Sequence, residues 1–381
     1  MQTLEQQKKS ILSERPFFEN LNGLRFSGAL MVFIFHCFTL NRDIWGDFTR
    51  SNTFQIMYKL ASKGHHGVGL FFVLSGFLIT FLLLNEISKN GSVNVKHFFM
   101  RRILRIWPIY FLIVLFGFFI FPQLPYGQST NHSLLMYGSF LSNLDEIAVG
   151  LTDSLNFLTV TWSVSIEEQF YLSWMFLMAV LPFFRKGKYF NNYFILLIII
   201  SIVFRFLNLA DERTLYFHTL SVISDLAIGG LLAYLVQKYS IQKILKPIKK
   251  IHLLLIYVAG ISLIIASNVI FKGVLVSIEK VIIGLFFAFV ILEQVYSDNS
   301  FYKIDKVPYF YQSGKLTYGF YMFHCVFIYY WSIFFANYGF TDSMWQFILY
   351  ILVVFISTYT TAYLSMKYLE KPLLGLKRYF R

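Results

Sequence analysis

Ten long apolar stretches alternate with short polar segments along the chain. They cover residues 24–41, 66–85, 106–122, 163–184, 192–209, 217–237, 252–270, 277–296, 317–336 and 344–366. Because a helix rises about 1.5 Å per residue, about 20 apolar residues cross the roughly 30 Å hydrocarbon core of a bilayer. The pattern predicts an all-α polytopic membrane protein with about ten transmembrane helices.

The composition agrees with this fold class. Hydrophobic residues make up 57% of the 381 residues and charged residues only 14%, whereas charged residues make up about a quarter of a soluble domain. A soluble enzyme with a large core is a remote alternative, because the uncharged run Leu253–Phe271 is too long for an ordinary core helix.

Positive charge is distributed unevenly between the two sides of this topology. The side that holds both chain ends carries 24 Lys and Arg residues and the opposite loops carry 6, while Arg25, Arg205 and Lys280 fall within the crossings. By the positive-inside rule, this bias places both termini in the cytoplasm. The net charge of +13 is then an orientation signal, and nucleic acid is not an expected partner.

The chain shows no low-complexity tract, internal repeat or flexible linker, so we expect one membrane domain over residues 1–381, with a core at about 18–375. The first apolar stretch follows about twenty polar-rich residues and lacks a small-residue cleavage site, which argues against a cleaved signal peptide. Cys37 and Cys325 lie inside apolar stretches without metal-ligand spacing. We therefore expect neither a disulfide nor a metal site.

The segment "NGLRFSGALMVFIFHC" places two polar residues on the first crossing, Arg25 near its start and His36 deep inside. On a helix the two lie on nearly the same face and about 16 Å apart along the axis, which puts His36 near mid-membrane. Ionisable residues within crossings are costly and often functional. Two interpretations stay open, a satisfied structural histidine and a group that handles protons.

The fourth crossing begins with "TWSVSIEEQFYLSW". Trp162 is expected at the membrane interface, and Glu167 and Glu168 enter the apolar region about 8–9 Å deeper. Adjacent helix positions point about 100° apart, so at least one carboxylate should face the protein interior. We expect Glu167 at a depth close to that of His36, either orienting a histidine base or forming an ion pair that holds two helices together.

The third crossing is preceded by "FFMRRILRIWPIY", which contains Arg101, Arg102, Arg105 and Tyr110 as further candidates. Arg102 and Arg105 share a helix face, as do Arg101 and Arg105. Guanidinium groups suit phosphate oxygens because they donate two parallel hydrogen bonds. Cytoplasmic arginines beside a helix also serve as topology signals and lipid-headgroup contacts.

Three more polar residues lie inside crossings. Ser75, in "GHHGVGLFFVLSGFLIT", joins glycines that permit close helix approach. Asp225 is another intramembrane carboxylate, with Arg205 as its expected partner, and His324 is another buried histidine. We expect Asp225 and His324 to be mainly structural and keep both as candidates.

The loop at residues 123–161 lies on the outer side of the expected topology. It contains no Lys or Arg but carries Asp145, Glu146 and Asp153. This loop either caps or shapes an outer binding site, or is an ordinary surface loop.

Taken together, these segments resemble the acyltransferase-3 family of bacterial integral membrane acyltransferases of glycans, in family order over about residues 18–375. Arg25-x10-His36 is similar to the first-helix signature, "GVGLFFVLSGFLIT" to the second, "RRILRIWPIY" to the arginine motif and "TWSVSIEEQFYL" to the Glu-bearing element. "LTYGFYMFH" and "EKPL" resemble later patterns. The soluble SGNH esterase domain that some members carry is not expected in this chain.

The resemblance implies an O-acyltransferase of the bacterial cytoplasmic (inner) membrane. The donor would be acyl-CoA, usually acetyl-CoA, bound from the cytoplasm, and the acceptor a hydroxyl of a cell-envelope glycan or lipid-linked sugar, with no metal. The resemblance implies His36 as the catalytic residue, acting as a base or as an acyl carrier, and Arg25 as its signature partner. It places Arg102 and Arg105 on the donor side.

Two other function classes are compatible with intramembrane charges. A polytopic transporter or flippase of a lipid-linked sugar would have paired repeats with broken helices, which the sequence does not show. A non-catalytic membrane partner would tolerate apolar replacements at His36 and Glu167. Nothing in the sequence indicates an oligomeric state.

Overall fold

A computed structural model of the protein describes residues 18, 20–150, 156–181, 184, 189–245 and 247–380. Throughout these residues the regular structure is helical, without strands. A long helix covers each expected crossing: α2 (Leu21–Thr39), α4 (His66–Asn90), α5 (Val95–Leu115), α8 (Thr161–Val180), α10 (Phe190–Leu207), α12 (Thr219–Tyr239), α14 (Lys250–Ile265), α16 (Val276–Tyr296), α17 (Phe310–Asn337) and α18 (Met344–Ser365).

The protein is an all-α, multi-pass membrane protein, as the sequence predicts. Eight helical segments among the described residues are long and apolar enough to cross a membrane. The helix α14 is apolar but has only 16 residues, and α8 places hydroxyl, carboxylate and amide side chains in its first three turns. These two helices account for the difference from the ten expected crossings.

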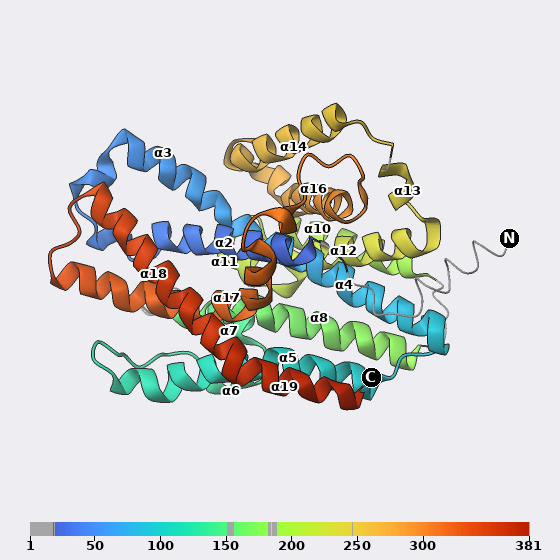
Figure 1. Ribbon diagram of the computed structural model, residues 1–381, viewed down its shortest axis with the longest axis horizontal. Helices are drawn as coiled ribbons and strands as arrows, with labels where there is room; N and C mark the ends of the chain where they lie inside the picture. The colour runs from blue at the N-terminus through green and yellow to red at the C-terminus, as the bar shows by residue number, and fades with distance from the viewer. Residues whose placement is uncertain are drawn as a thin grey trace.

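The long helices run mostly along one axis and pack side by side (Figure 1). The helix α4 packs against α2, α12 and α16, and α12 in turn packs against α10. The helix α17 packs against both α2 and α18. The first and the penultimate long helices of the chain are therefore neighbours, and this brings His36 and His324 within reach of each other.

Glycines allow α4 and α12 to approach closely. A Cβ atom on Gly229 of α12 would collide with the carbonyl oxygen of Val73, and one on Gly76 of α4 would collide with that of Leu226. Backbone-to-backbone packing of this kind is common between membrane helices. The expectation that Gly76 serves helix packing is confirmed.

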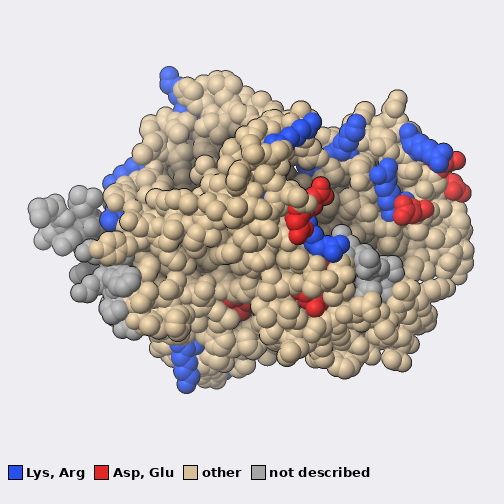
Figure 2. All heavy atoms as spheres, turned by 180° about the vertical axis from the view of Figure 1, so that it is seen from behind, with Lys and Arg blue, Asp and Glu red and all other residues tan. Residues whose placement is uncertain are grey.

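The outward surface is largely uncharged. Large apolar side chains such as Ile199, Leu255 and Ile356 are more than half exposed. The face shown in Figure 2 carries Lys, Arg, Asp and Glu at only a few places. Extended apolar surface of this kind is suited to contact with lipid.

Short helices complete the chain: α3 (Asn52–Ala61), α6 (Leu134–Gly138), α7 (Ser142–Val149), α11 (Glu212–Phe217), α13 (Gln242–Leu245), α15 (Ser267–Ile270) and α19 (Lys371–Gly375). In Figure 1, α3 and α6 lie at the left-hand end. The end of α4 and the start of α5 lie toward the right-hand end. The end of α4 and the start of α5 line one hollow together with Lys377, and Lys89 and Arg101 belong to these two segments. We call this end of the molecule the basic end, and the opposite one the loop end.

Candidate functional site

A cavity of about 520 Å³ extends into the helix bundle from the basic end. Such a volume is typical of small-molecule sites, which measure about 300–1,000 Å³. Five candidates from four different helices line it, namely Arg25 of α2, Ser75 of α4, Arg102 and Arg105 of α5, and Glu167 of α8. The structure thus brings together residues that are widely separated in the sequence.

A second hollow of about 510 Å³ adjoins this cavity at the basic end. Both are lined by Arg102, Arg105 and Lys377. The hollow adds the polar and basic side chains of Lys89, His97 and Arg101. Arg101 itself donates hydrogen bonds to Glu86 (3.2 Å) and to the Phe380 carbonyl (2.8 Å).

Cationic groups outnumber carboxylates in the cavity wall. The lining includes five Lys and Arg side chains, Arg25, Arg102, Arg105, Lys315 and Lys377, and the two carboxylates Glu167 and Glu370. The guanidinium of Arg102 lies 4.6 Å from the ring centre of Tyr171, and that of Arg25 donates to Asn22 at 3.4 Å. An excess of guanidinium groups in a recess suits a ligand with several negative charges.

Glu167 is held by hydroxyl groups. Its two carboxylate oxygens accept hydrogen bonds from Ser75 (2.7 Å) and Tyr171 (2.9 Å). Ser75 therefore has a hydrogen-bonding role in addition to its small size. The expected contact between Glu167 and His36 is not among the hydrogen bonds of the described residues, in which Glu167 instead binds these two hydroxyls.

His324 is the partner of His36. The His36 Nδ1 and His324 Nε2 atoms are 2.7 Å apart, and the two rings are stacked with their centres 5.0 Å apart. The other nitrogen of His324, Nδ1, lies 2.6 Å from the Tyr321 carbonyl oxygen, which can only accept. His324 therefore carries its proton on Nδ1 and accepts a hydrogen bond from His36 Nδ1, which leaves the His36 Nε2 lone pair free. The expectation that His324 is mainly structural did not include this hydrogen bond with His36.

Tyr321 separates the cavity from the two imidazoles. It lines the cavity, and its ring centre lies 5.7 Å from that of His324. Its hydroxyl is hydrogen-bonded to Ser163 at 2.9 Å. His36 is not among the residues that line the cavity, although part of its own surface is exposed. The side chain of Tyr321 thus lies next to both the cavity and the imidazole pair.

The remaining candidates support the site from outside the cavity. Trp162 is buried and packs its ring against Phe217. Glu168 accepts a hydrogen bond from Trp107 at 3.2 Å. Tyr110 is fully buried and donates to the Tyr137 carbonyl at 2.8 Å.

Asp225 does not form the expected pair with Arg205. Its side chain is buried between Gly69 of α4 and Gly284 of α16. Arg205 instead donates to the carbonyls of Val276 and Leu215, and its nearest carboxylate is Glu279 at 3.7 Å. The separation follows from the helix packing, because Arg205 reaches the start of α16 while Asp225 lies deeper.

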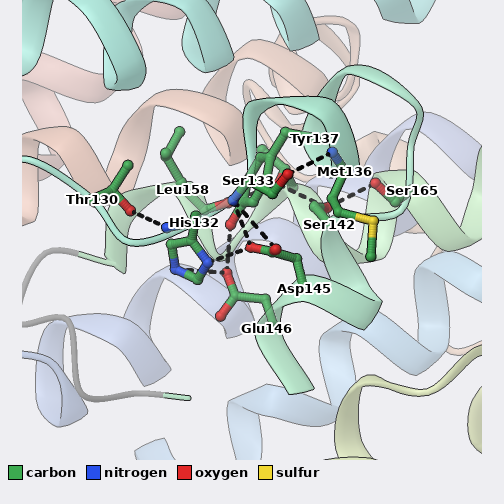
Figure 3. Close-up of polar contacts among 11 residues, drawn as sticks. Thr130, His132, Ser133, Met136, Tyr137, Ser142, Asp145, Glu146, Leu158 and Ser165 are labelled. Atoms are coloured by element: carbon green, nitrogen blue, oxygen red, sulfur yellow. Dashed lines mark hydrogen bonds and ion pairs between the residues drawn. The ribbon is translucent and has the colours of Figure 1, made fainter. Parts of the chain in front are cut away.

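The acidic residues of the 123–161 loop face inward (Figure 3). Asp145 binds His132 Nδ1 at 2.6 Å, and Glu146 accepts from the Tyr137 hydroxyl at 2.7 Å. Burial, together with the adjacent Glu146 carboxylate, raises the pKa of Tyr137, so its hydroxyl keeps the proton that it donates. These carboxylates clamp the loop together and offer no outer binding surface; Asp153 lies outside the described residues.

Sequence reasoning missed three residues near the site. Tyr171 and Tyr321 were identifiable by spacing, because they lie four residues after Glu167 and three before His324, on the same helix faces. Cys325 has its sulfur 3.3 Å from His324 Nε2 and 3.5 Å from His36 Nδ1. The position of Cys325 next to His324 was visible in the sequence, but its contact with His36 was not, since His36 lies on another helix.

Comparisons with known proteins give a consistent picture. The model of a family described as "Acyltransferase domain" matches residues 18–367. The chain is 25% identical over 378 residues to O-acetyltransferase OatA of Staphylococcus aureus, covering 94% of this chain and 57% of that protein. It is 28% identical over 240 residues to peptidoglycan O-acetyltransferase OatA of Listeria monocytogenes, covering 60% of this chain and 35% of that protein.

The chain spans a little more than half of the length of the Staphylococcus aureus relative. No solved structure matches it.

Proposed function

The chain belongs to the acyltransferase domain family, and from this premise we propose that it is a membrane O-acyltransferase. The acyl group is acetyl, the donor is acetyl-CoA from the cytoplasm, and the acceptor is a hydroxyl of a cell-envelope glycan. The names of the two relatives support the acetyl group, and one of them supports a glycan acceptor. The observation that carries the proposal is the arginine-rich cavity that ends one side chain from a paired histidine.

The donor would enter at the basic end. Coenzyme A is a polyanionic nucleotide on a long thin arm, and Arg102, Arg105 and Lys377 border both the hollow and the cavity. Guanidinium groups bind phosphate oxygens through paired, charge-assisted hydrogen bonds. With its phosphates held there, the arm would follow the cavity past Arg25 and present the thioester at Tyr321.

Tyr321 would then have to turn away from Ser163 for the thioester to reach His36. The hydrogen bond to Ser163 would add only about 0.5–1.5 kcal/mol to the cost of this motion. Closure of the same ring between reactions would keep water from the cytoplasm away from the imidazoles.

His36 would act as the general base. Its Nε2 lone pair takes the proton of the acceptor hydroxyl while that oxygen attacks the thioester carbonyl carbon. The C–S bond then breaks, and the protonated imidazole returns the proton to the leaving thiolate. Positioned proton transfer of this kind contributes about 10²–10⁴-fold to the rate. Glu167, bound to Ser75 and Tyr171, would balance the arginines rather than touch the base.

A binding experiment tests the donor and excludes a transporter of a lipid-linked sugar. Titration of the detergent-purified chain with CoA should show one site. The double variant Arg102→Ala/Arg105→Ala should weaken binding at least about tenfold, since a hydrogen bond to a charged group contributes about 1.5–3 kcal/mol. Arg50→Ala is the matched control, because Arg50 is exposed and pairs only on the surface with Asp47. Absence of CoA binding by a folded chain would overturn the proposal.

A labelling experiment separates direct transfer from an acyl-histidine relay. The chain is mixed with acetyl-CoA labelled in the acetyl group, without acceptor, and then digested for mass spectrometry. Direct transfer predicts no stable label on His36. Acetyl-His36 would replace the base mechanism with a two-step relay.

A further inference from the structure

Three atoms with metal-binding chemistry meet at the imidazole pair. His36 Nδ1, His324 Nε2 and Cys325 Sγ all lie within 4.8 Å of one another. The sulfur is 3.5 Å from His36 Nδ1 and 3.3 Å from His324 Nε2. Imidazole nitrogen and cysteine sulfur are both zinc ligands, and catalytic zinc sites combine three protein ligands with an open fourth position.

The spacing is close to that of a tetrahedral site. With metal–nitrogen bonds of about 2.0–2.1 Å and a metal–sulfur bond of about 2.3 Å, sulfur and nitrogen lie about 3.6 Å apart and two nitrogens about 3.3 Å apart. The two sulfur–nitrogen distances, 3.3 and 3.5 Å, are within about 0.3 Å of that value. The nitrogen–nitrogen distance of 2.7 Å is that of a hydrogen bond, and it has to open by about 0.6 Å when a cation replaces the shared proton.

The surroundings of the three donors also resemble those of metal ligands. Histidine ligands usually donate their second ring N–H to a carbonyl or carboxylate, which fixes the ring and its tautomer. His324 does so through Nδ1, which donates to the Tyr321 carbonyl at 2.6 Å. Cys325 and His324 are almost completely buried, whereas part of the His36 surface is exposed. The exposed part of His36 is therefore the side from which a small cation would approach the group.

We propose that His36, His324 and Cys325 bind a thiophilic divalent cation such as Zn²⁺, and that this binding switches the enzyme off. The second half rests on the proposed function, in which His36 Nε2 is the base. On binding, the Cys325 thiol loses its proton to solvent, and sulfur and both imidazole nitrogens bind the cation. The His36 proton moves from Nδ1 to Nε2, which occupies the lone pair that the reaction needs.

Cobalt(II) provides a direct probe of this site, because a bound thiolate gives a charge-transfer absorption. The chelator-treated chain in detergent is titrated with Co²⁺ and then with Zn²⁺. We expect one equivalent of Co²⁺ with a thiolate band, which Zn²⁺ removes. Cys325→Ser should lose the band and bind Co²⁺ at least about tenfold more weakly, as even outer partners of metal sites contribute about 10–100-fold.

Cys37→Ser is the matched control, because Cys37 is also buried and adjoins His36 in the sequence, yet its sulfur is not part of the donor group. This variant should keep the band. A wild-type chain without a thiolate band, or a band that survives in Cys325→Ser, would overturn the metal site. His324→Phe gives a second variant, which should also lose the one-equivalent binding.

Inhibition is measured separately, as the ratio of acetyl transfer with Zn²⁺ to transfer with chelator for each variant. Zn²⁺ should inhibit the wild type and Cys37→Ser at least about tenfold more strongly than Cys325→Ser. If Zn²⁺ inhibited the wild type, Cys37→Ser and Cys325→Ser equally, inhibition through this metal site would be refuted. If the chelated wild type transfers no acetyl group, the proposed function fails, and the Co²⁺ band still decides the metal site.

Discussion

Which nitrogen of His36 carries the proton depends on its partner, the neutral imidazole of His324. A carboxylate at the same place would favour the charged imidazolium, which cannot act as a base. A neutral imidazole that already donates to the Tyr321 carbonyl can only accept at Nε2. It therefore fixes the tautomer of His36 and adds no charge in the membrane, where an unpaired charge is costly.

Replacement of His324 should therefore impair the chemical step more than donor binding. We expect His324→Phe to lower kcat at least about tenfold, because His36 Nδ1 loses its acceptor and the tautomer with the lone pair on Nε2 is no longer fixed; the full contribution of a base is about 10²–10⁴-fold. The CoA dissociation constant should not change. Steady-state kinetics and CoA titration check this, with His252→Phe on the exposed surface of α14 as control. A change in CoA affinity alone would contradict this role.

Substitutions of Tyr321 test the route of the thioester, since this side chain lies next to both the cavity and His324. Tyr321→Phe keeps the ring but loses the bond to Ser163, and should preserve transfer. Tyr321→Trp enlarges the barrier and should reduce transfer at least about tenfold, with an overpacking cost of about 1–3 kcal/mol in stability. Both variants should still bind CoA. Transfer at the wild-type rate by a folded Tyr321→Trp would show that the thioester takes another route.

Among the elements, α8 shows what the sequence could and could not predict. Its position and its inward-facing Glu167 follow from the hydrophobic pattern and from the cost of a charge in lipid. Its partners do not, because the hydroxyl of Ser75 comes from α4. In the same way, α2 and α17 were predictable as helices, but the pairing of His36 with His324 depends on a contact between segments 288 positions apart.

The packing of α4 on α12 gives a prediction about stability. A Cβ at Gly229 would collide with the backbone of Val73, so Gly229→Ala must push the two helices apart. We expect a loss of about 1–3 kcal/mol, the usual cost of overpacking, seen as a lower Tm of the detergent-solubilised protein. Gly138→Ala is the control, because nothing lies within 4 Å of a Cβ there. Equal Tm values for the two variants would contradict the close approach.

At the scale of the whole molecule, the charge bias and the proposed donor site favour the same orientation. The 24 Lys and Arg residues on the side of the chain ends include Arg102, Arg105 and Lys377, which border the cavity mouth. These three residues thus contribute to the orientation signal and would also bind the phosphate groups of a donor from the cytoplasm. Under the proposed function, topology and donor binding are therefore linked, and an inverted protein would present its cavity to the side that lacks acyl-CoA.

Cysteine accessibility tests this orientation in intact cells. Asn90→Cys lies at the basic end and Leu135→Cys at the loop end, and both positions are exposed. The native Cys37 and Cys325 are buried, with exposed fractions of 1% and 2%, so they contribute little background. A membrane-impermeant maleimide should label Leu135→Cys in intact spheroplasts, and Asn90→Cys only after permeabilisation, as the positive-inside rule requires. The reverse pattern would place the arginine cavity outside the cell, out of reach of acyl-CoA, and both the donor and the direction of transfer would have to be abandoned.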